Sequence, residues 1–431
     1  MRFARALERS ATTRVNTNTA LDVRRRRSNA PRASIARTAE DVGKQNASVD
    51  LLLDALGANE RATCSTNADG VRGLFAKRPL ARGEPVLEVP LGEFALMDDP
   101  GSQTTWSRQL ARKVVELRRR ALERDEATTI MRHYAMSLPK YGAPAIGLAN
   151  DPSRVRALAV EWDCKEAVAD MTTFAKQVDD SYARELELDQ TLREDEWRWA
   201  VSLVHSRTFR IEDERGKRPT RRALIAAADL LNHSSVKEEV NCDWSANDEY
   251  FVVSTTREVR EGEELLISYG EQCDRHFALF YGFVPRRNPY NRVKLFFNGR
   301  EALDWYQALC GAPPDAPGWH NEKERVVKLV CDKYGTYKLD KATGLRRRVI
   351  QDLYLGEGGK VNESMLLLFN EMCGDEDMAI AAVRERAKEL REKMIEATAR
   401  IDASLDGLDD YSRALVRDYR QRKIDILSHI I

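Results

Sequence analysis

The most informative stretch of this 431-residue sequence is Ala228-Asp229-Leu230-Leu231-Asn232-His233-Ser234. Its polar side chains directly follow an apolar run, residues 223–228, which is typical of a buried segment. Buried polar groups need hydrogen-bond partners, so such a cluster indicates either a built site or a helix end followed by a turn. The stretches on either side of it in the chain separate these interpretations.

Two further stretches bear on the first. The later one is Glu261-Gly262-Glu263-Glu264-Leu265-Leu266-Ile267-Ser268-Tyr269-Gly270, which predicts a turn and then a strand over residues 264–269. The earlier one is Gly70-Val71-Arg72-Gly73-Leu74-Phe75-Ala76. Two glycines before an apolar strand allow a ligand to approach bare backbone amides, although an ordinary hairpin also explains them. A tyrosine at a strand end is, by itself, as well explained by a core position.

Together, and in this order, the three stretches resemble the motifs of SET-domain methyltransferases. The glycine-rich first motif of that family is similar to residues 70–76, its Asn-His motif to Asn232-His233, and its Glu-Leu…Tyr closing motif to residues 264–269. The intact motifs speak against a catalytically inactive SET scaffold, which is one alternative function.

The resemblance is narrower still, to the subgroup of Rubisco large-subunit lysine methyltransferase-like proteins. That subgroup has a Ser-Arg-x-Phe segment after a Trp-containing helix, similar to Ser206-Arg207-Thr208-Phe209 after Trp199, and a Tyr-Gly-Phe step, similar to residues 281–283. It lacks the cysteine-rich zinc segment of other SET enzymes, and the seven cysteines here include no C-x-x-C pair. No metal is therefore expected.

The resemblance implies an α+β fold. We expect a SET-type domain of short β-sheets over residues 48–298, with a helical insert at about 100–200, and an all-α substrate-binding domain over residues 299–431. Hydrophobic periodicity agrees with this order, because helical spacing alternates with short apolar runs. The periodicity predicts helices over residues 154–162, 165–179, 195–204, 379–401 and 408–426, and strands over residues 251–254, 264–269 and 292–297.

The resemblance also implies the roles of individual residues. Tyr269 is the expected catalytic residue, its hydroxyl orienting the acceptor amine and the methyl donor S-adenosyl-L-methionine. The expected cofactor-binding residues are Gly73, Leu74, Phe75, Arg207, Asn232 and His233. The expected substrate-binding residues are Ser206, Phe209, Asp229 and Tyr281. A purely structural role stays possible for three of them. Asp229 is then a turn cap, and Phe209 and Tyr281 are core residues.

The expected activity is methylation of lysine in a non-histone protein such as Rubisco or fructose-bisphosphate aldolase, by a monomeric enzyme. Free lysine has a pKa near 10.4, so the site has to favour the neutral amine. The alternative acceptor is histidine. By resemblance to a histidine-methylating relative, a channel for histidine has a polar residue at the position of Phe209 and a bulky aromatic residue at that of Ala228. This sequence has neither.

Composition limits the partners. Lysine plus arginine and aspartate plus glutamate each total 69, a balance that argues against a nucleic-acid binder. No apolar run is long enough to predict a membrane span. Residues 1–45 are rich in arginine, alanine, serine and threonine and poor in acidic residues, which is typical of an organellar transit peptide. We expect a chloroplast address, with a mitochondrial or nuclear one, or a disordered terminus, as alternatives.

Overall fold

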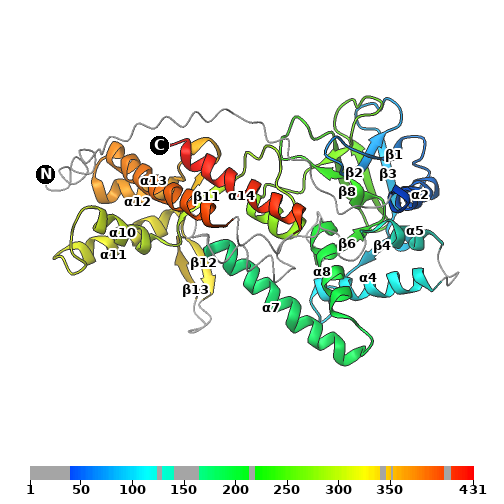
Figure 1. Cartoon of the computed structure of the whole chain (residues 1–431), viewed down its shortest axis with the longest axis horizontal. Coiled ribbons are helices and arrows are strands. Elements are labelled where there is room, and N and C mark those ends of the chain that lie inside the picture. Colours follow the sequence, from blue (N-terminus) through cyan, green and yellow to red (C-terminus); the bar gives the residue numbers. More distant parts are fainter. Residues whose placement is uncertain are drawn as a thin grey trace. The chain divides into compact units, whose positions relative to one another are not determined.

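The computed structural model describes residues 39–123, 129–139, 165–212, 219–339, 346–350, 353–401 and 409–431 (Figure 1). These residues form two compact units. The first contains residues 39–289, 400–401 and 409–419, and the second contains residues 290–399 and 420–431, each with the gaps just given. The predicted domain boundaries at residues 48 and 298 stay predictions.

Most of the predicted leader, up to residue 38, and the predicted helix over residues 154–162 lie outside the described residues. The helix α2, Ala39–Ala55, begins before the predicted leader ends. Its Gln45 is buried and donates a 3.1 Å hydrogen bond to the carbonyl oxygen of Leu138. The predicted boundary at residue 45 therefore falls inside a folded helix.

Short sheets and small ladders build the first unit, as the sequence predicts. A hairpin joins β1 (Ala62–Thr66) to β2 (Arg72–Ala76). One three-stranded antiparallel sheet has the order β3-β9-β8, and the other has the order β4-β6-β5. Their bounds are Pro85–Pro90 for β3, Tyr250–Thr255 for β9, Cys242–Ala246 for β8, Ala95–Met97 for β4, Arg221–Ile225 for β6 and Phe209–Ile211 for β5.

A helical insert separates β4 from β5, as predicted. Its described helices are α4 (Trp106–Leu122), α5 (Thr129–Ser137), α7 (Lys165–Leu188) and α8 (Glu194–Arg207). Helices α4 and α8 pack together (Figure 1). Arg119 of α4 binds Glu196 of α8 at 2.6 Å, and Leu110 and Val114 on the apolar face of α4 are fully buried. The insert thus positions α8, which carries Ser206 and Arg207 at its last residues.

The second unit is mainly helical and contains several short strands. Its helices are α10 (Gly299–Leu309), α11 (Trp319–Tyr334), α12 (Glu363–Cys373) and α13 (Glu376–Ile401), together with the last residues of α14 (Asp410–Ser428). The rings of Phe296, Trp305, Tyr306 and Phe369 pack together in its core.

The strands of the second unit depart from the all-α expectation. Strand β11 (Arg292–Phe296), which the sequence predicts, pairs antiparallel with β14 (Leu353–Gly356), which it does not. A separate hairpin joins β12 (Thr336–Leu339) to β13 (Arg346–Val349). The α+β fold class, with a helical C-terminal region after the short sheets, is confirmed.

Candidate active site

Backbone pairing brings the three sequence motifs together. Strand β7 (Asn232–His233) runs parallel to β10 (Leu266–Ile267), with Asn232 opposite Leu266 and His233 opposite Ile267. On the other side of the closing motif, Phe75 forms a bridge with Glu264, and the amide of Leu265 donates to the carbonyl oxygen of Leu74 at 2.8 Å. The predicted strand over residues 264–269 is therefore shorter than expected, because its two ends pair with different segments.

Tyr269 lies just beyond β10 and is fixed at both its backbone and its side chain. Its amide donates to Nδ1 of His233 at 3.0 Å, and its hydroxyl donates to the carbonyl oxygen of Leu231 at 2.6 Å. Burial raises the pKa of the Tyr269 hydroxyl, although the nearby charge of Arg207 opposes this. The hydroxyl is therefore neutral at physiological pH.

His233 is held in one tautomer by its two hydrogen bonds. Its Nδ1 accepts from a backbone amide, which can only donate, so the proton is on Nε2, which lies 2.7 Å from Oγ of Ser235. Burial lowers the pKa of His233 to about 4. Its ring stacks on those of Tyr269, at 5.0 Å, and Phe277, at 4.6 Å. His233 is thus neutral, and its Nδ1 hydrogen bond and its stacked ring hold Tyr269 in position.

Asn232 has a fixed amide orientation. Its Nδ2 donates to Oε1 of Glu264 at 2.7 Å and to the carbonyl oxygen of Arg72 at 3.1 Å. Both N–H groups are then used, so Oδ1 faces the other way as an acceptor. Gly73 makes this packing possible, because a Cβ atom there would lie 2.5 Å from Nδ2 of Asn232 and 2.7 Å from Oε1 of Glu264. The glycine thus accommodates protein side chains, whereas the sequence analysis expected it to accommodate a ligand.

A buried ion pair lies beside the motifs. Nη1 of Arg207 donates to the carbonyl oxygen of Asp229 at 2.8 Å and approaches its Oδ2 at 3.3 Å. The hydroxyl of Tyr134, which is fully buried on α5, also donates to Oδ2 of Asp229 at 3.0 Å. Burial raises the pKa of the Asp229 carboxyl, against the lowering charge of Arg207. Asp229 therefore ties α5 and the end of α8 to the segment before Asn232, and its carbonyl oxygen is already engaged.

Tyr281 lies against Tyr269, with ring centroids 5.2 Å apart and ring planes 26° apart. It ends a π-helical turn, Phe277–Tyr281, in which the amide of Gly282 bonds to the carbonyl oxygen of Phe277 five residues earlier. Gly282 then takes a left-handed conformation (φ 77°). The two tyrosines form one aromatic wall.

Ser206 lies next to Arg207 at the end of α8, and its substrate-binding role stays a prediction, whereas Phe209 lies elsewhere. The hydroxyl of Ser206 donates back to the carbonyl oxygen of Ser202 within α8, at 2.8 Å. The ring of Phe209 packs on Phe251, at 4.7 Å, and Trp244, at 5.6 Å, between the two three-stranded sheets. Within the described part of the chain, no ring contact joins Phe209 to Tyr269 or Tyr281. The structure thus groups Gly73, Arg207, Asp229, Asn232, His233, Tyr269 and Tyr281, and leaves Phe209 in a separate aromatic cluster.

Glu264 and Tyr134 have no role that is predicted from the sequence. Glu264 was part of a quoted motif, but its task becomes visible only in three dimensions: it accepts hydrogen bonds from Asn232, and from Asn67 at 3.1 Å. Tyr134 lies 95 residues before its partner Asp229, within a helix that carries no motif. A buried tyrosine next to a buried carboxylate would have been the only sequence signal, and burial cannot be read for one residue.

The donors and acceptors of the site suit the amino-acid end of S-adenosylmethionine. The carboxylate Oδ1 of Asp229 is buried without a hydrogen-bond partner in the described residues, and Oδ1 of Asn232 faces away from Glu264. Both are acceptors for an ammonium or hydroxyl group. Arg207 uses only Nη1 toward Asp229 in the recorded contacts, so its remaining N–H groups suit a carboxylate.

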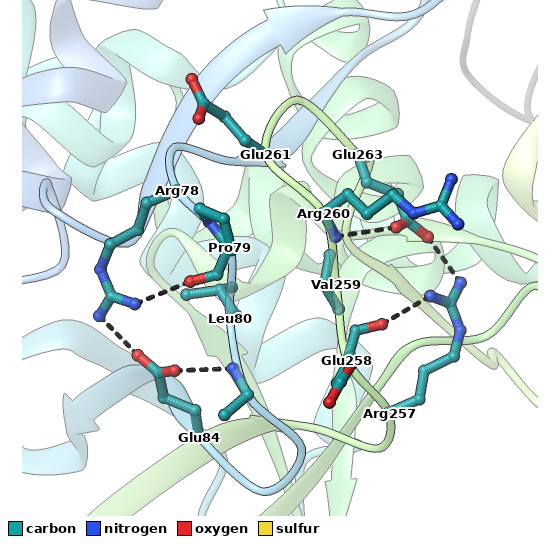
Figure 2. Close-up of a pocket in the computed structure, with 11 residues that line it drawn as sticks. Arg78, Pro79, Leu80, Glu84, Arg257, Glu258, Val259, Arg260, Glu261 and Glu263 are labelled. Carbon is teal, nitrogen blue, oxygen red and sulfur yellow. Dashed lines mark hydrogen bonds and ion pairs between the residues drawn. The ribbon is translucent and has the colours of Figure 1, made fainter.

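One surface pocket lies apart from these residues (Figure 2). It lies between the turns 78–84 and 257–263, which a Leu80–Val259 bridge joins. Its charged side chains largely satisfy one another, since Arg78 pairs with Glu84 at 2.5 Å and Arg257 with Glu263 at 2.6 Å. None of the predicted site residues lines it, and it has no part in the proposed chemistry.

The described residues contain neither a candidate metal site nor a helix that could span a membrane. No group of three or more His, Cys, Asp or Glu side chains in them could hold a metal ion. Likewise, none of the described helices is long and apolar enough to cross a membrane.

The fold and the assembled motifs define a class. Residues 71–270 match the family model "SET domain", and this part of the chain has the fold and the motifs of that domain. SET methyltransferases use S-adenosylmethionine as methyl donor.

Solved structures of Rubisco LSMT share this fold across both units. The structure of Rubisco LSMT bound to AdoMet has a TM-score of 0.53 and 15% sequence identity and covers 90% of each chain. The SET domain of LSMT bound to lysine and AdoHcy has a TM-score of 0.52, with the same identity and coverage. At this identity, the likeness shows the fold alone.

Curated relatives match a shorter segment. Actin-histidine N-methyltransferases from Canis lupus familiaris and Homo sapiens are 32% and 31% identical over 114 residues. The match covers 26% of this chain and 19% of each relative, about a fifth of their length. It supports the class and leaves the choice between lysine and histidine to experiment.

Proposed function

We propose that this protein is an S-adenosylmethionine-dependent protein-lysine N-methyltransferase acting on a non-histone protein, with Rubisco and fructose-bisphosphate aldolase as the leading substrates. The observation that carries the proposal is the aromatic wall of Tyr269 and Tyr281, with the hydroxyl of Tyr269 held by the Leu231 carbonyl oxygen. A chloroplast location is proposed with it, on the composition of residues 1–45.

The bound cofactor supplies an electrophilic methyl group on a sulfonium centre. Arg207 would hold its carboxylate, and Asn232 and Asp229 would accept from its donor groups. Tyr269 and Tyr281 would confine and orient the acceptor side chain, and alignment of this kind is most of what a displacement needs. Weak C–H···O contacts from backbone carbonyl oxygens suit a polarised methyl group.

Neither His233 nor Tyr269 is available as a general base for the acceptor. Both ring nitrogens of His233 are engaged, and the hydroxyl of Tyr269 stays neutral. A lysine must therefore lose its proton before it reacts, either to solvent or because an apolar wall and a nearby sulfonium charge disfavour its charged form. The rate at limiting acceptor is expected to rise with pH.

Histidine is the second candidate acceptor, and the similarity to actin-histidine N-methyltransferases favours it. Against it stands the side chain at position 228. Ala228 is fully buried and offers only a methyl group, so it supplies no polar partner for the second nitrogen of an imidazole.

The decisive experiment offers purified Rubisco, aldolase and actin to the protein with radiolabelled S-adenosylmethionine, and locates the label by mass spectrometry. Label on a lysine supports the proposal, and label on an actin histidine replaces it with the second candidate. Tyr269→Phe is the control. The pH profile is an independent check, because a lysine acceptor gains rate up to about pH 10, whereas a histidine acceptor reaches its plateau above about pH 6.5. Absence of both label and calorimetric cofactor binding would leave only an inactive SET scaffold.

A further inference from the structure

The hairpin β12–β13 of the second unit is strongly basic. Residues 336–349 contain five lysine or arginine residues and one aspartate, a formal charge of +4, in a chain whose total charge is zero. A concentration of charge of one sign on one element attracts a partner of the opposite sign over a distance of about a Debye length.

This hairpin has open strand edges. It forms a sheet of its own, and neither strand pairs with a third strand within the described ranges. Two-stranded hairpins are marginally stable alone, and their outer edges can accept another extended chain. Here Arg348 anchors the hairpin, since Nη1 donates to the carbonyl oxygen of Asp332 at 2.9 Å and Nε to that of Gly335 at 3.2 Å.

One face of the hairpin presents an aromatic ring beside arginine. Tyr337 lies opposite Arg348 in the register, and the Arg348 guanidinium stacks over its ring at 5.6 Å. Tyr337 is 70% exposed, which is the largest exposed fraction among the large hydrophobic side chains of the described residues. Arg346 is also exposed, on the same face two residues from Arg348, and no ion pair is recorded for it in this part of the chain. Tyrosine and arginine are the side chains that most often dominate protein-binding surfaces.

We propose that this face, made of Tyr337, Arg346 and Arg348, docks an acidic, extended segment of the protein substrate. The inference rests on the proposed function, because it takes the partner to be the protein that is methylated. The positive charge selects an acidic segment, the open edge selects an extended one, and the exposed ring favours a protein over a bare polyanion. Docking at this face would let the enzyme select between substrate proteins, which a single acceptor side chain in the methyl-transfer site cannot distinguish.

A competing explanation for the basic residues is that they protect the hairpin edge from aggregation. Lysine and arginine on an open edge also prevent strand-to-strand aggregation, and in that case the charges have no partner. Nucleic acid is a second competitor, because arginines bind phosphate as well as carboxylate.

The test measures direct binding and needs no methyl transfer, so its failure differs from failure of the proposed function. The probe is a fluorescein-labelled peptide of alternating glutamate and serine with one central tyrosine, and its partner probe replaces glutamate with glutamine. Fluorescence anisotropy is read at low and high salt with the full chain. The hairpin variant is Arg346→Glu. The matched control is Arg384→Glu on α13, where the arginine is also exposed and the charge change is the same.

The wild-type chain is expected to bind the glutamate peptide in a salt-sensitive way and to bind the glutamine peptide far more weakly. The hairpin variant should bind the glutamate peptide at least about tenfold more weakly, with the control unchanged and cofactor affinity preserved in both. Equal binding by the wild type and the hairpin variant would overturn the proposal in favour of edge protection. Tighter, competing binding of a labelled oligothymidine would overturn it in favour of nucleic acid.

Discussion

The hydroxyl of Tyr269 donates a 2.6 Å hydrogen bond to the carbonyl oxygen of Leu231, a residue 38 positions earlier. This bond joins the closing motif to the segment that begins the Asn-His motif. Because the hydroxyl is neutral and already bonded, we expect its contribution to the proposed methyl transfer to be orientation.

Replacing Tyr269 with phenylalanine tests that contribution. The ring stays stacked on Tyr281 and His233, but the Leu231 carbonyl oxygen loses its partner and the acceptor loses an orienting group. We expect kcat to fall by about 10²-fold while cofactor affinity changes little, measured by labelled methyl transfer and calorimetry. Tyr281→Phe is the matched control, since no hydrogen bond of its hydroxyl is recorded within the described chain, and it should cost much less. Equal losses in both variants would contradict an orienting role for the Tyr269 hydroxyl.

Gly73 can be tested by adding a single methyl group. Gly73→Ala puts a Cβ atom 2.5 Å from Nδ2 of Asn232, so the amide must move off Glu264. We expect a loss of about 1–3 kcal/mol in the free energy of unfolding, by urea denaturation, together with weaker cofactor binding. Gly92→Ala is the control. Gly92 is exposed in the helix α3, Leu91–Phe94, and nothing lies within 4 Å of its added Cβ. The interpretation fails if both alanine variants bind cofactor like the wild type.

The ion pair of Arg207 and Asp229 predicts which of two substitutions destabilises the folded protein more. Asp229→Asn leaves the Arg207 charge without its counter-charge in a buried site, which should cost about 3–5 kcal/mol in the free energy of unfolding. Tyr134→Phe removes one hydrogen bond to the same carboxylate and should cost about 1 kcal/mol. Urea denaturation of both variants measures the difference, and a larger cost for Tyr134→Phe would show that Asp229 is not charged in the folded protein.

Stability should fall as the pH drops from about 6.5 to about 4. Burial lowers the pKa of both His233 and His205 to about 4 in the folded chain, whereas an unfolded histidine titrates near 6.5. In this window the unfolded state binds more protons than the folded state, so the free energy of unfolding decreases with decreasing pH. Urea denaturation at several pH values checks the slope.

A variant separates the histidines from other groups in that window. His205 lies among the rings of Trp106, Phe174 and Phe280, so His205→Phe keeps an aromatic side chain that cannot take up a proton. The slope between pH 6.5 and 4 should become shallower in this variant. An unchanged slope would assign the effect to residues other than His205.

Much of the site follows from the sequence because motif residues act through the backbone segments that carry them. Asn232, His233 and Tyr269 meet because β7 and β10 pair, and the resemblance of their motifs to those of SET domains implies that they meet. Arg207 and Tyr281 follow from the resemblance in the same way. The cofactor, the SET fold and the helical insert were predicted together with them.

The residues that the sequence could not give depend on side-chain packing. Tyr134 and Glu264 act through contacts across 95 and 32 positions, which no local pattern encodes. Phe209 was expected beside the acceptor but packs on Trp244 and Phe251, because β5 pairs with β6 at the edge of a sheet. Strand β14 was missed because four residues before a glycine-rich turn carry too little periodicity to separate a strand from a helix end.

The position of Tyr281 in the site depends on the number of residues in the π-helical turn that ends there. A residue removed from Phe277–Tyr281 would convert the wide turn into an ordinary α-helical one and rotate whatever follows by about 100° around the helix axis. The ring of Tyr281 would then leave Tyr269, although every functional side chain would still be present. Substitutions along this turn can be tolerated one by one, but a single-codon deletion there would dismantle the aromatic wall.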